Sequence, residues 1–368
     1  MELKSFKDIS LSRLGMGNMR LPVGPGGDKD IDFEKAKAII DYGMAHGINY
    51  YDTAYVYHDQ QSEIFVGQAL KDYERSSYYI ATKFSSGASH DYEKMFEKQL
   101  QKLNTDYIDF YLLHAVMNAN VDFYLESGCI DYFLEQQKKG RIKYFGFSSH
   151  ADPDKLEKIA NHHKWDFAQL QINYYDWLYG TSKEEYEILN SRDIPIMVME
   201  PVRGGRLATL TPETVDILKN AHPDWSVASW ALRFVRSLSG VQVILSGMSN
   251  LNQIADNVST FEDDAPLSEK DKELLFKVCE IFHDRLVVPC TACRYCTPDC
   301  PKNINIPEWL NLYNTYKCDG TWGIKEQAAK IDSIGNPNDC IACGSCTRHC
   351  PQNIDTPASM KELAEVLA

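Results

Sequence analysis

Two runs of cysteine near the end of the chain are spaced so that several thiolates could bind one inorganic group. The runs are Cys290-x2-Cys293-x2-Cys296-x3-Cys300-Pro301 and Cys340-x2-Cys343-x2-Cys346-x3-Cys350-Pro351. Three thiolates at this spacing wrap around an iron–sulfur cube, and the fourth, which precedes proline, usually ligates the other cluster of a pair. The sequence therefore predicts two [4Fe-4S] clusters with crossed ligand sets. One set is Cys290, Cys293, Cys296 and Cys350, and the other is Cys340, Cys343, Cys346 and Cys300.

The main alternative is a pair of zinc sites, because the C-x2-C spacing also suits zinc. Zinc takes four ligands in a tetrahedral array and rarely combines this spacing with a trailing proline, so iron–sulfur chemistry is favoured. A disulfide framework is not expected, because only Cys129 and Cys279 precede residue 290 and the N-terminus lacks a secretory signal. Cys279 and Cys318 fit neither run, and we expect both to be buried as small hydrophobic side chains.

A second group of residues has the types needed for acid–base chemistry on a carbonyl. Asp52, Tyr57, Lys83 and His114 lie at or just after the ends of short apolar runs. Tyrosine, with a pKa near 10, is a poor acid at neutral pH unless a cation such as Lys83 stabilises its phenolate. Asp52 would keep the lysine charged, and His114 could donate to the oxygen that gains negative charge as a carbonyl accepts hydride. Each residue alone is more often structural, but the four together are harder to obtain by chance.

The apolar runs between residues 14 and 260 predict the scaffold that positions these side chains. Eight of them alternate with amphipathic helical patterns, and they span 14–18, 48–53, 78–84, 109–115, 144–149, 166–172, 194–200 and 241–247. Eight βα repeats over about 250 residues predict an α/β fold, the (β/α)8 TIM barrel, whose chemistry sits at the C-terminal ends of the strands. No G-x-G-x-x-G opens the first helix, so nucleotide binding of the Rossmann kind is not expected.

Length and composition indicate two domains. A chain of 368 residues exceeds the size at which one core usually keeps growing. We place the TIM barrel at 1–284 and a small α+β or helical ferredoxin-like domain at 285–368. The net charge of -14 argues against nucleic-acid binding. No apolar run approaches the roughly 20 residues of a membrane span, and the N-terminal sequence indicates a cytoplasmic location.

Specific motifs make the barrel similar to the aldo-keto reductase family over most of residues 10–260. They are Asp52-Thr53-Ala54-x-x-Tyr57 followed by SEIFVGQAL, ATK at 81–83, DFYLLHA at 109–115 and KKGRIKYFGFSS at 138–149. The resemblance implies that Tyr57 is the general acid and that Lys83 and Asp52 tune it. It also implies that His114 orients the carbonyl of a small-molecule substrate.

The same resemblance implies an extended nicotinamide nucleotide, NAD(H) or NADP(H), laid across the strand ends. The implied contacts are Gly17, Met19, Ser148, Ser149, Gln169, Gly204, Gly205, Gly247, Gln253 and Asn257, with Gln171 as a further candidate for the carboxamide. A 2′-phosphate is usually recognised by Arg or Lys, and neither occurs from 246 to 257, so NADH is favoured. Arg203 or Arg206 could serve NADPH instead.

The tail is similar to bacterial dicluster ferredoxins over roughly residues 286–355. The whole chain resembles the aldo-keto reductases of anaerobic bacteria and archaea that carry such a domain. The expected function is reduction of a carbonyl or oxidation of an alcohol, with the clusters transferring electrons and a ferredoxin or other electron carrier as partner. Two alternatives are structural clusters, or a redox-sensing or electron-carrying protein with an inactive barrel. A hydride carries two electrons, whereas each cluster carries one. A flavin that converts between the two is therefore a further candidate cofactor.

Overall fold

The computed structural model of the chain describes all residues except 264, 285 and 322. The described residues form two compact units. The first contains Met1–Val202 and Asp224–Lys272, and the second contains Arg203–Pro223 and Glu273–Ala368. Residue 285, where the sequence places the start of the second domain, lies outside the described residues, so that boundary stays a prediction. The contacts also group the segment Arg203–Pro223, which follows a barrel strand, with the cysteine-rich tail.

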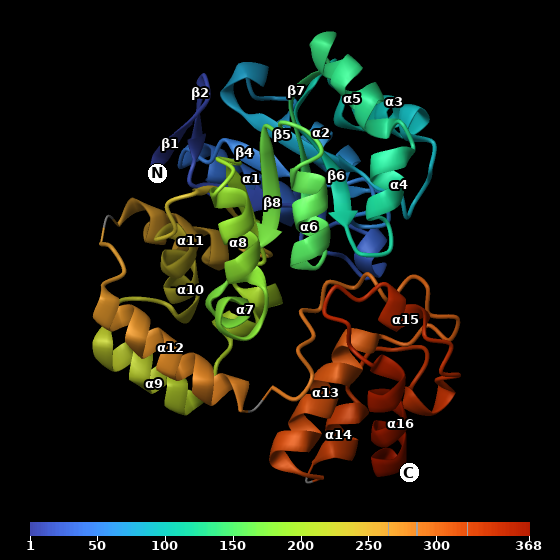
Figure 1. The fold of residues 1–368 in the computed structure, drawn as a ribbon. Coiled ribbons are helices and arrows are strands. Elements are labelled where there is room, and N and C mark those ends of the chain that lie inside the picture. The colour runs from blue at the N-terminus through green and yellow to red at the C-terminus, as the bar shows by residue number, and fades with distance from the viewer. Residues whose placement is uncertain (264, 285, 322) are drawn as a thin grey trace. The chain divides into compact units, whose positions relative to one another are not determined.

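Eight parallel strands close into a barrel in the first unit (Figure 1). They are β3 (Leu14–Gly17), β4 (Tyr50–Asp52), β5 (Tyr79–Phe84), β6 (Ile108–Val116), β7 (Ile142–Ser149), β8 (Phe167–Gln171), β9 (Ile196–Met199) and β10 (Val241–Ser246). Neighbouring strands follow the chain order, and β10 closes on β3. The predicted TIM barrel is therefore confirmed, and each predicted strand overlaps an observed one.

An N-terminal hairpin that the sequence analysis did not identify packs with the barrel interior. Its strands are β1 (Leu3–Phe6) and β2 (Ile9–Ser12), which pair antiparallel. Phe6 and Leu11 are buried in one cluster with Tyr50 and Phe110 of the barrel strands, and the rings of Phe6 and Phe110 lie 5.4 Å apart. Aromatic packing of this kind contributes beyond the area it buries. The hairpin therefore stabilises the barrel by adding apolar side chains to its core.

Helices follow most strands of the first unit. They are α1 (Phe33–Ala45), α2 (Ser62–Leu70), α3 (Tyr92–Leu103), α4 (Val121–Glu126), α5 (Cys129–Lys138), α6 (Pro153–Ala160), α7 (Tyr174–Tyr179), α8 (Ser182–Asn190), α10 (Val227–Arg236) and α11 (Leu251–Glu262). Short 3-10 turns span Gly27–Lys29 and Arg75–Ser77. The first turn of α1 is capped by the Asp32 side chain, which accepts from the Lys35 N–H. No helix within the described residues is both long and apolar enough to cross a bilayer.

The second unit is built largely from short helices around an apolar core. The elements are a 3-10 segment η3 (Arg203–Ala208), α9 (Pro212–Ala221), α13 (Ile306–Asp319), α14 (Ile324–Ala328), η4 (Pro337–Asp339), α15 (Ser345–Arg348) and α16 (Thr356–Leu367). Helix α12 (Glu269–His283) begins in the first unit and ends in the second. Trp309, Leu310, Met360 and Leu363 of α13 and α16 are buried together. Cys279 is buried as expected, but the prediction for Cys318 was wrong, because Cys318 is exposed near the end of α13.

The two cysteine runs adopt the same backbone conformation 50 residues apart. Left-handed φ angles occur at Ala292 and Ala342 (53° and 54°), and again at Asn303 and Asn353 (52° and 51°). Such angles are uncommon for residues other than glycine, so a matched pair marks a shared structural requirement. A helix begins six residues after the last cysteine of each run, at Ile306 for α13 and at Thr356 for α16. The second unit therefore contains an internal repeat, made of each cysteine run and the helix that follows it.

The contact between α2 and α3 gives a test of this fold. A Cβ added at Gly67 would lie 2.7 Å from the carbonyl oxygen of Lys102 and 2.8 Å from that of Leu103, and backbone cannot yield as a side chain can. We expect Gly67→Ala to destabilise the protein by about 1–3 kcal/mol in chemical denaturation. Gly87→Ala is the control, because its new Cβ would meet only the Ser85 hydroxyl at 4.0 Å. Equal midpoints for the two variants would contradict the packing described.

Candidate active site and cluster-binding cysteines

The centre of the barrel site is a buried ion pair between Lys83 and Asp52. The Lys83 Nζ atom donates to both Asp52 carboxylate oxygens and to the Thr53 carbonyl oxygen, each at 2.7 Å. Strand register explains this contact: Asp52 of β4 lies opposite Ala81 of β5, and Lys83 follows two residues later on the same face. Lys83 is 0 % exposed and Asp52 is 3 % exposed. Both charges are therefore removed from water, and each is compensated by the other.

Burial and pairing act in opposite directions on the charges of this pair. Burial raises the pKa of Asp52, and the nearby Lys83 ammonium lowers it. Burial likewise lowers the pKa of Lys83, while Asp52 and the more distant Glu63 raise it. Removing one partner of such a pair leaves an uncompensated buried charge, which is strongly destabilising. The protonation of either residue therefore depends on the presence of the other.

Tyr57 and His114 lie beside this ion pair, as the sequence predicts. The Tyr57 ring centroid is 5.1 Å from Lys83 Nζ and 5.8 Å from the ring centroid of His114. Tyr57 is 8 % exposed and His114 is 5 % exposed. The structure thus brings all four predicted acid–base residues together at the C-terminal end of the barrel strands. Their catalytic roles stay a proposal.

The loop that carries Tyr57 is fixed by its own hydrogen bonds. The Ser62 hydroxyl donates to the Asn18 carbonyl oxygen at 2.9 Å and lies 2.8 Å from the Thr53 hydroxyl. Directly after Tyr57, the three residues His58, Asp59 and Gln60 have left-handed φ angles of 51°, 49° and 68°. Three such residues in succession are unusual for side chains larger than glycine, so the surrounding contacts must hold this turn. The turn sends the chain into α2 and leaves Tyr57 beside Lys83.

His114 is kept neutral by its surroundings. Burial is the largest cause that lowers the pKa of His114 well below its ordinary value, and the Lys83 charge and His150 lower it further. A neutral imidazole still has one N–H group, so it can donate one hydrogen bond without carrying a charge. His114 is therefore suited to donate to a substrate oxygen at neutral pH.

A buried network around Glu63, which the sequence analysis missed, supports the strand that carries Lys83. Glu63 is 0 % exposed, and its Oε1 atom accepts from the Thr82 hydroxyl at 2.7 Å and from Gln99 at 2.5 Å. Gln99 also donates to the Lys83 carbonyl oxygen at 3.0 Å, and Lys102 pairs with Glu63 at 3.2 Å. The available signal was an acidic residue on the buried face of the SEIFVGQAL helix. Glu63 thus holds the Thr82 side chain directly, and it orients Gln99, which binds the carbonyl oxygen of Lys83.

The residues predicted to hold the nicotinamide end lie on adjacent strands. Ser148 of β7 pairs in register with Gln169 of β8. Ser148 Oγ accepts from the Ala115 N–H at 2.8 Å, and Ser149 Oγ accepts from Ala151 at 3.1 Å, so both hydroxyls are engaged with backbone. Gln169 is 1 % exposed, and its Oε1 atom has no hydrogen-bond partner among the described residues. An unsatisfied buried acceptor is suited to a ligand N–H group.

Gln171, the further candidate on β8, is already committed to a protein partner. Its side-chain N–H donates to Asp176 Oδ2 at 2.7 Å, and Asn173 donates to the same oxygen at 2.7 Å. This carboxylate orients both amides. Gln169 is therefore better placed than Gln171 to contact a carboxamide.

Other residues are predicted to contact the far end of the nucleotide, and these lie near β3 and β10. A Cβ on Gly17 would lie 3.6 Å from the Ser246 carbonyl oxygen and 3.7 Å from the Gly247 nitrogen, so the two strand ends adjoin. Met19 follows β3 and is half-buried. On α11, Asn257 donates to the Ser246 hydroxyl at 2.7 Å, and Gln253 accepts from the Ser249 N–H at 2.7 Å.

An ion pair that was not predicted joins the ends of two nearby strands. Arg20, after β3, donates to Glu200, after β9, at 3.2 Å. The Arg20 side chain also lies over Gly247, whose added Cβ would meet it at 3.3 Å. This arginine therefore places a positive charge among the predicted contacts Gly17, Met19 and Gly247.

Two predicted pyrophosphate contacts belong to the second compact unit. Gly204 and Gly205 lie in η3, with φ angles of 66° and 91° that favour glycine. Arg206, an alternative phosphate ligand, donates from Nε to the Cys290 carbonyl oxygen at 3.1 Å and from Nη1 to Asn311 at 2.8 Å. The other predicted nucleotide contacts lie in the barrel unit. The role of η3 in binding a nucleotide stays a prediction.

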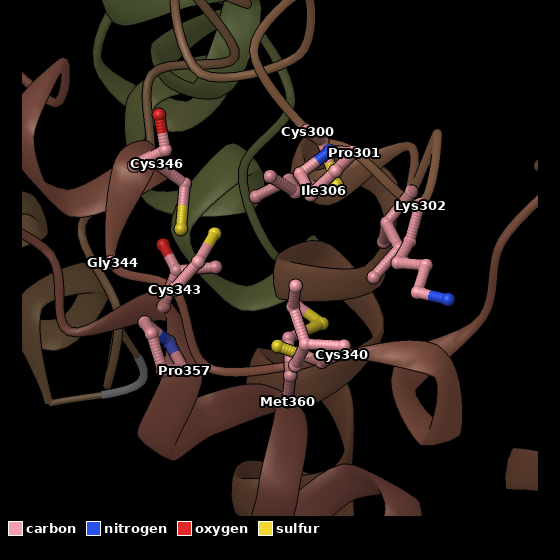
Figure 2. A pocket seen from close by; sticks show the side chains of 14 residues that line it. Cys300, Pro301, Lys302, Ile306, Cys340, Cys343, Gly344, Cys346, Pro357 and Met360 are labelled. Carbon is pink, nitrogen blue, oxygen red and sulfur yellow. The ribbon is translucent and has the colours of Figure 1, made fainter.

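Each predicted ligand set lines a cavity of its own in the second unit. Cys300, Cys340, Cys343 and Cys346 line one cavity, and Figure 2 shows their side chains around it. Cys290, Cys293, Cys296 and Cys350 line the other, which Cys346 also borders. Thiolates bound to one zinc ion lie only about 2.3 Å from it. Among the described residues, no three Cys, His, Asp or Glu side chains are grouped to hold a single metal ion. Each cavity is lined by at least four cysteine thiols, which are the donors that an iron–sulfur cluster takes.

Comparison with known proteins identifies both parts of the chain. The sequence model of the aldo/keto reductase family matches residues 13–278. The chain belongs to this family. The model of the 4Fe-4S dicluster domain matches residues 289–354. The protein is therefore an aldo/keto reductase-type oxidoreductase with an iron–sulfur domain, and both resemblances seen in the sequence are confirmed.

Relatives of the barrel share about a quarter of its residues. An uncharacterized oxidoreductase, YqkF, from Bacillus subtilis is 27% identical over 285 residues, which are 68% of this chain and 87% of the relative. The NADH-specific methylglyoxal reductase of Escherichia coli is 24% identical over 319 residues, 74% of this chain and 96% of the relative. Among solved structures, the aldo-keto reductase AKR11C1 from Bacillus halodurans superposes with a TM-score of 0.63 at 26% identity, covering 76% of this chain and 96% of that one.

The low pKa of His114 predicts how stability depends on pH. The unfolded chain takes up a proton near pH 6.5 that the folded protein excludes, so stability is lost as pH falls below that value. We expect the stability of the wild-type protein to fall more steeply than that of His114→Asn between pH 7 and pH 5. Denaturant unfolding at each pH, with cluster-loaded protein, measures the difference. His162→Asn, at an exposed position, should keep the wild-type slope; equal slopes for His114→Asn and wild type would refute the assignment.

Proposed function

We propose that the barrel reduces a small-molecule carbonyl with a nicotinamide cofactor, or oxidises the corresponding alcohol, and that Tyr57 is the proton donor. The observation that carries this proposal is the group of Tyr57, His114 and the buried Lys83–Asp52 pair at the strand ends. Membership of the aldo/keto reductase family supports it. The complete group argues against a barrel that has lost activity.

Protons and electrons balance in this reaction. A nicotinamide cofactor, if held by Gln169 and the other predicted contacts, would supply the two electrons to the carbonyl carbon as a hydride. Tyr57 gives its hydroxyl proton to the carbonyl oxygen, so the C=O double bond becomes an alcohol and Tyr57 becomes a phenolate. The Lys83 ammonium, 5.1 Å from the Tyr57 ring centroid, stabilises that phenolate until a proton from solvent restores it. His114 donates to the substrate oxygen as charge develops there.

Gln169 supports the nicotinamide assignment. Its Oε1 atom is buried with no hydrogen-bond partner among the described residues, and it can accept from a carboxamide N–H. We propose NADH as the preferred form, because the segment 246–257 contains no Lys or Arg to bind a 2′-phosphate. The Escherichia coli relative, which is named as NADH-specific, agrees with that choice. Arg206, the alternative phosphate ligand, already holds Cys290 and Asn311.

Substitution of Tyr57 tests the acid. Tyr57→Phe removes the proton donor but keeps the ring, and we expect kcat with NADH to fall at least about 100-fold. Methylglyoxal is a suitable first probe, because a sequence relative is named for it. Tyr55→Phe is the matched control, since Tyr55 lies in the same loop and is also 8 % exposed. Iron content should be unchanged in both variants. Full activity in Tyr57→Phe would overturn the proposal.

We also propose that the second unit binds two [4Fe-4S] clusters and exchanges single electrons with a ferredoxin or similar carrier. The two cavities, each lined by one crossed ligand set, support the cluster count. The exposed Cys343 supports electron exchange, because a carrier can approach a cluster held there. The alternative is a purely structural role. Cluster absorbance followed during turnover distinguishes the two roles, and an assay for bound flavin shows whether a flavin links two-electron to one-electron chemistry.

Crossed ligation gives a sharp test with cysteine variants. Cys350→Ser should alter the same cluster as Cys293→Ser, although residue 350 belongs to the other run, because both line one cavity. Electron paramagnetic resonance of the reduced, anaerobically purified protein identifies which cluster signal is lost. Cys318→Ser is the control and should keep both signals, since Cys318 belongs to neither run and lines neither cavity described here. Loss of the Cys340–Cys346 signal in Cys350→Ser would show that ligation is not crossed.

A further inference from the structure

The two cysteine loops share a backbone shape but have different surroundings. In the first loop, Cys290 is 7 % exposed and the next residue, Thr291, is 3 % exposed. In the second loop, the corresponding Ile341 is 58 % exposed, and Cys343 is exposed as well. The inner cluster site at Cys290 and the outer cluster site at Cys343 are therefore not equivalent.

Two arginines from the segment after β9 lie against the inner cluster site. Arg206 donates from Nε to the Cys290 carbonyl oxygen at 3.1 Å. Arg203 is 1 % exposed, and it donates to the side chain of Gln352 at 3.1 Å. Gln352 lines the same cavity as Cys290. Both guanidinium groups belong to the same compact unit as the cysteines.

The cations beside the outer cluster site are more open to water. Arg348 donates to the Cys343 carbonyl oxygen at 3.3 Å, but its side chain is exposed. Lys302 also borders that cavity, and its ammonium points away from the cysteines (Figure 2). Charges in water are screened, whereas buried ones act through a lower effective dielectric constant. The inner site therefore has the stronger positive field.

Reduction adds one negative charge to a cluster, so a nearby fixed positive charge favours the reduced form. Burial of a cluster acts in the opposite direction, because the added charge is less well solvated. On burial alone the inner cluster would be the harder one to reduce. A unit charge at about 10 Å, with an effective dielectric constant near 20, changes such an equilibrium by a factor on the order of ten. Two arginines therefore shift the potential of the inner cluster in the direction that opposes burial.

We propose that Arg203 and Arg206 raise the reduction potential of the Cys290 cluster so that it accepts electrons from the cluster at Cys343. This inference deepens the proposed electron-transfer role and rests on both clusters being present. A one-electron carrier protein reduces the exposed outer cluster, and that electron then passes to the inner cluster, so one cluster is oxidised as the other is reduced. The arginines are positioning residues for this transfer, and they lie in the chain four and seven residues after the end of β9.

A redox titration followed by electron paramagnetic resonance tests the proposal. Cys343→Ser first assigns the outer cluster signal. We expect Arg206→Gln to make the reduction potential of the inner cluster more negative and to leave that of the outer cluster unchanged. In the singly reduced protein, the population with the electron on the inner cluster, relative to that with the electron on the outer cluster, should fall about tenfold. Arg206→Lys, which keeps the charge, should restore most of the shift. Arg348→Gln is the matched control, and it should move only the outer potential, by less. An unchanged inner potential in Arg206→Gln would overturn the proposal.

A second variant keeps the test decisive if Arg206→Gln does not load clusters. Asn311 is exposed on α13 and accepts from Arg206 at 2.8 Å, so Asn311→Asp places a negative charge against the guanidinium with little change of shape. It should lower the inner potential in the same direction, and more strongly at low salt. An unchanged or raised inner potential would refute the role of Arg206. Iron and sulfide content are measured separately, and wild-type protein lacking two clusters would instead refute the proposed dicluster function.

Discussion

A lysine and an aspartate buried side by side can both stay charged only while each compensates the other. The Lys83–Asp52 pair is such a case at the candidate active site, and other parts of the barrel hold the two side chains in contact. Parallel register between β4 and β5 brings the two residues to the same face, and the Glu63 network holds the Thr82 hydroxyl and the Lys83 carbonyl oxygen. In the mechanism that we propose, the positive charge that this arrangement preserves stabilises the phenolate of Tyr57 and so lets its hydroxyl act as an acid near neutral pH.

The strands and acid–base residues of the barrel could be predicted because their signals are local. An apolar run ending in a polar residue places that residue at a strand end, and in a closed parallel barrel all such ends lie at one rim. Glu63 could not be assigned in this way, because its role depends on Gln99 and Thr82, which approach it only in the folded protein. The N-terminal hairpin was missed for a similar reason, since its two strands of four residues gain their stability from packing with Tyr50 and Phe110.

The tail shows the same division between local and distant information. Cysteine spacing predicted the family domain, and the cavities agree with the crossed sets because each run repeats its backbone turns 50 residues later. The cysteine spacing could not predict that the two sites have different surroundings, because Arg206 lies 84 residues before Cys290 in the chain. The expectation for Cys318 failed because composition gives the average burial of cysteine but not the face of α13 on which one cysteine falls.

The segment Arg203–Pro223 has a further consequence for how the chain matures. It is made early, directly after a barrel strand, yet its contacts lie with residues beyond 272. During synthesis, Arg203, which is 1 % exposed in the folded protein and donates to Gln352 of the tail, leaves the ribosome well before that partner does. If the barrel closes first, this segment still lacks the residues with which it forms a compact unit. The iron–sulfur domain supplies those residues when it is made. A chain that ended between the regions matched by the two family models would therefore leave this segment exposed to solvent.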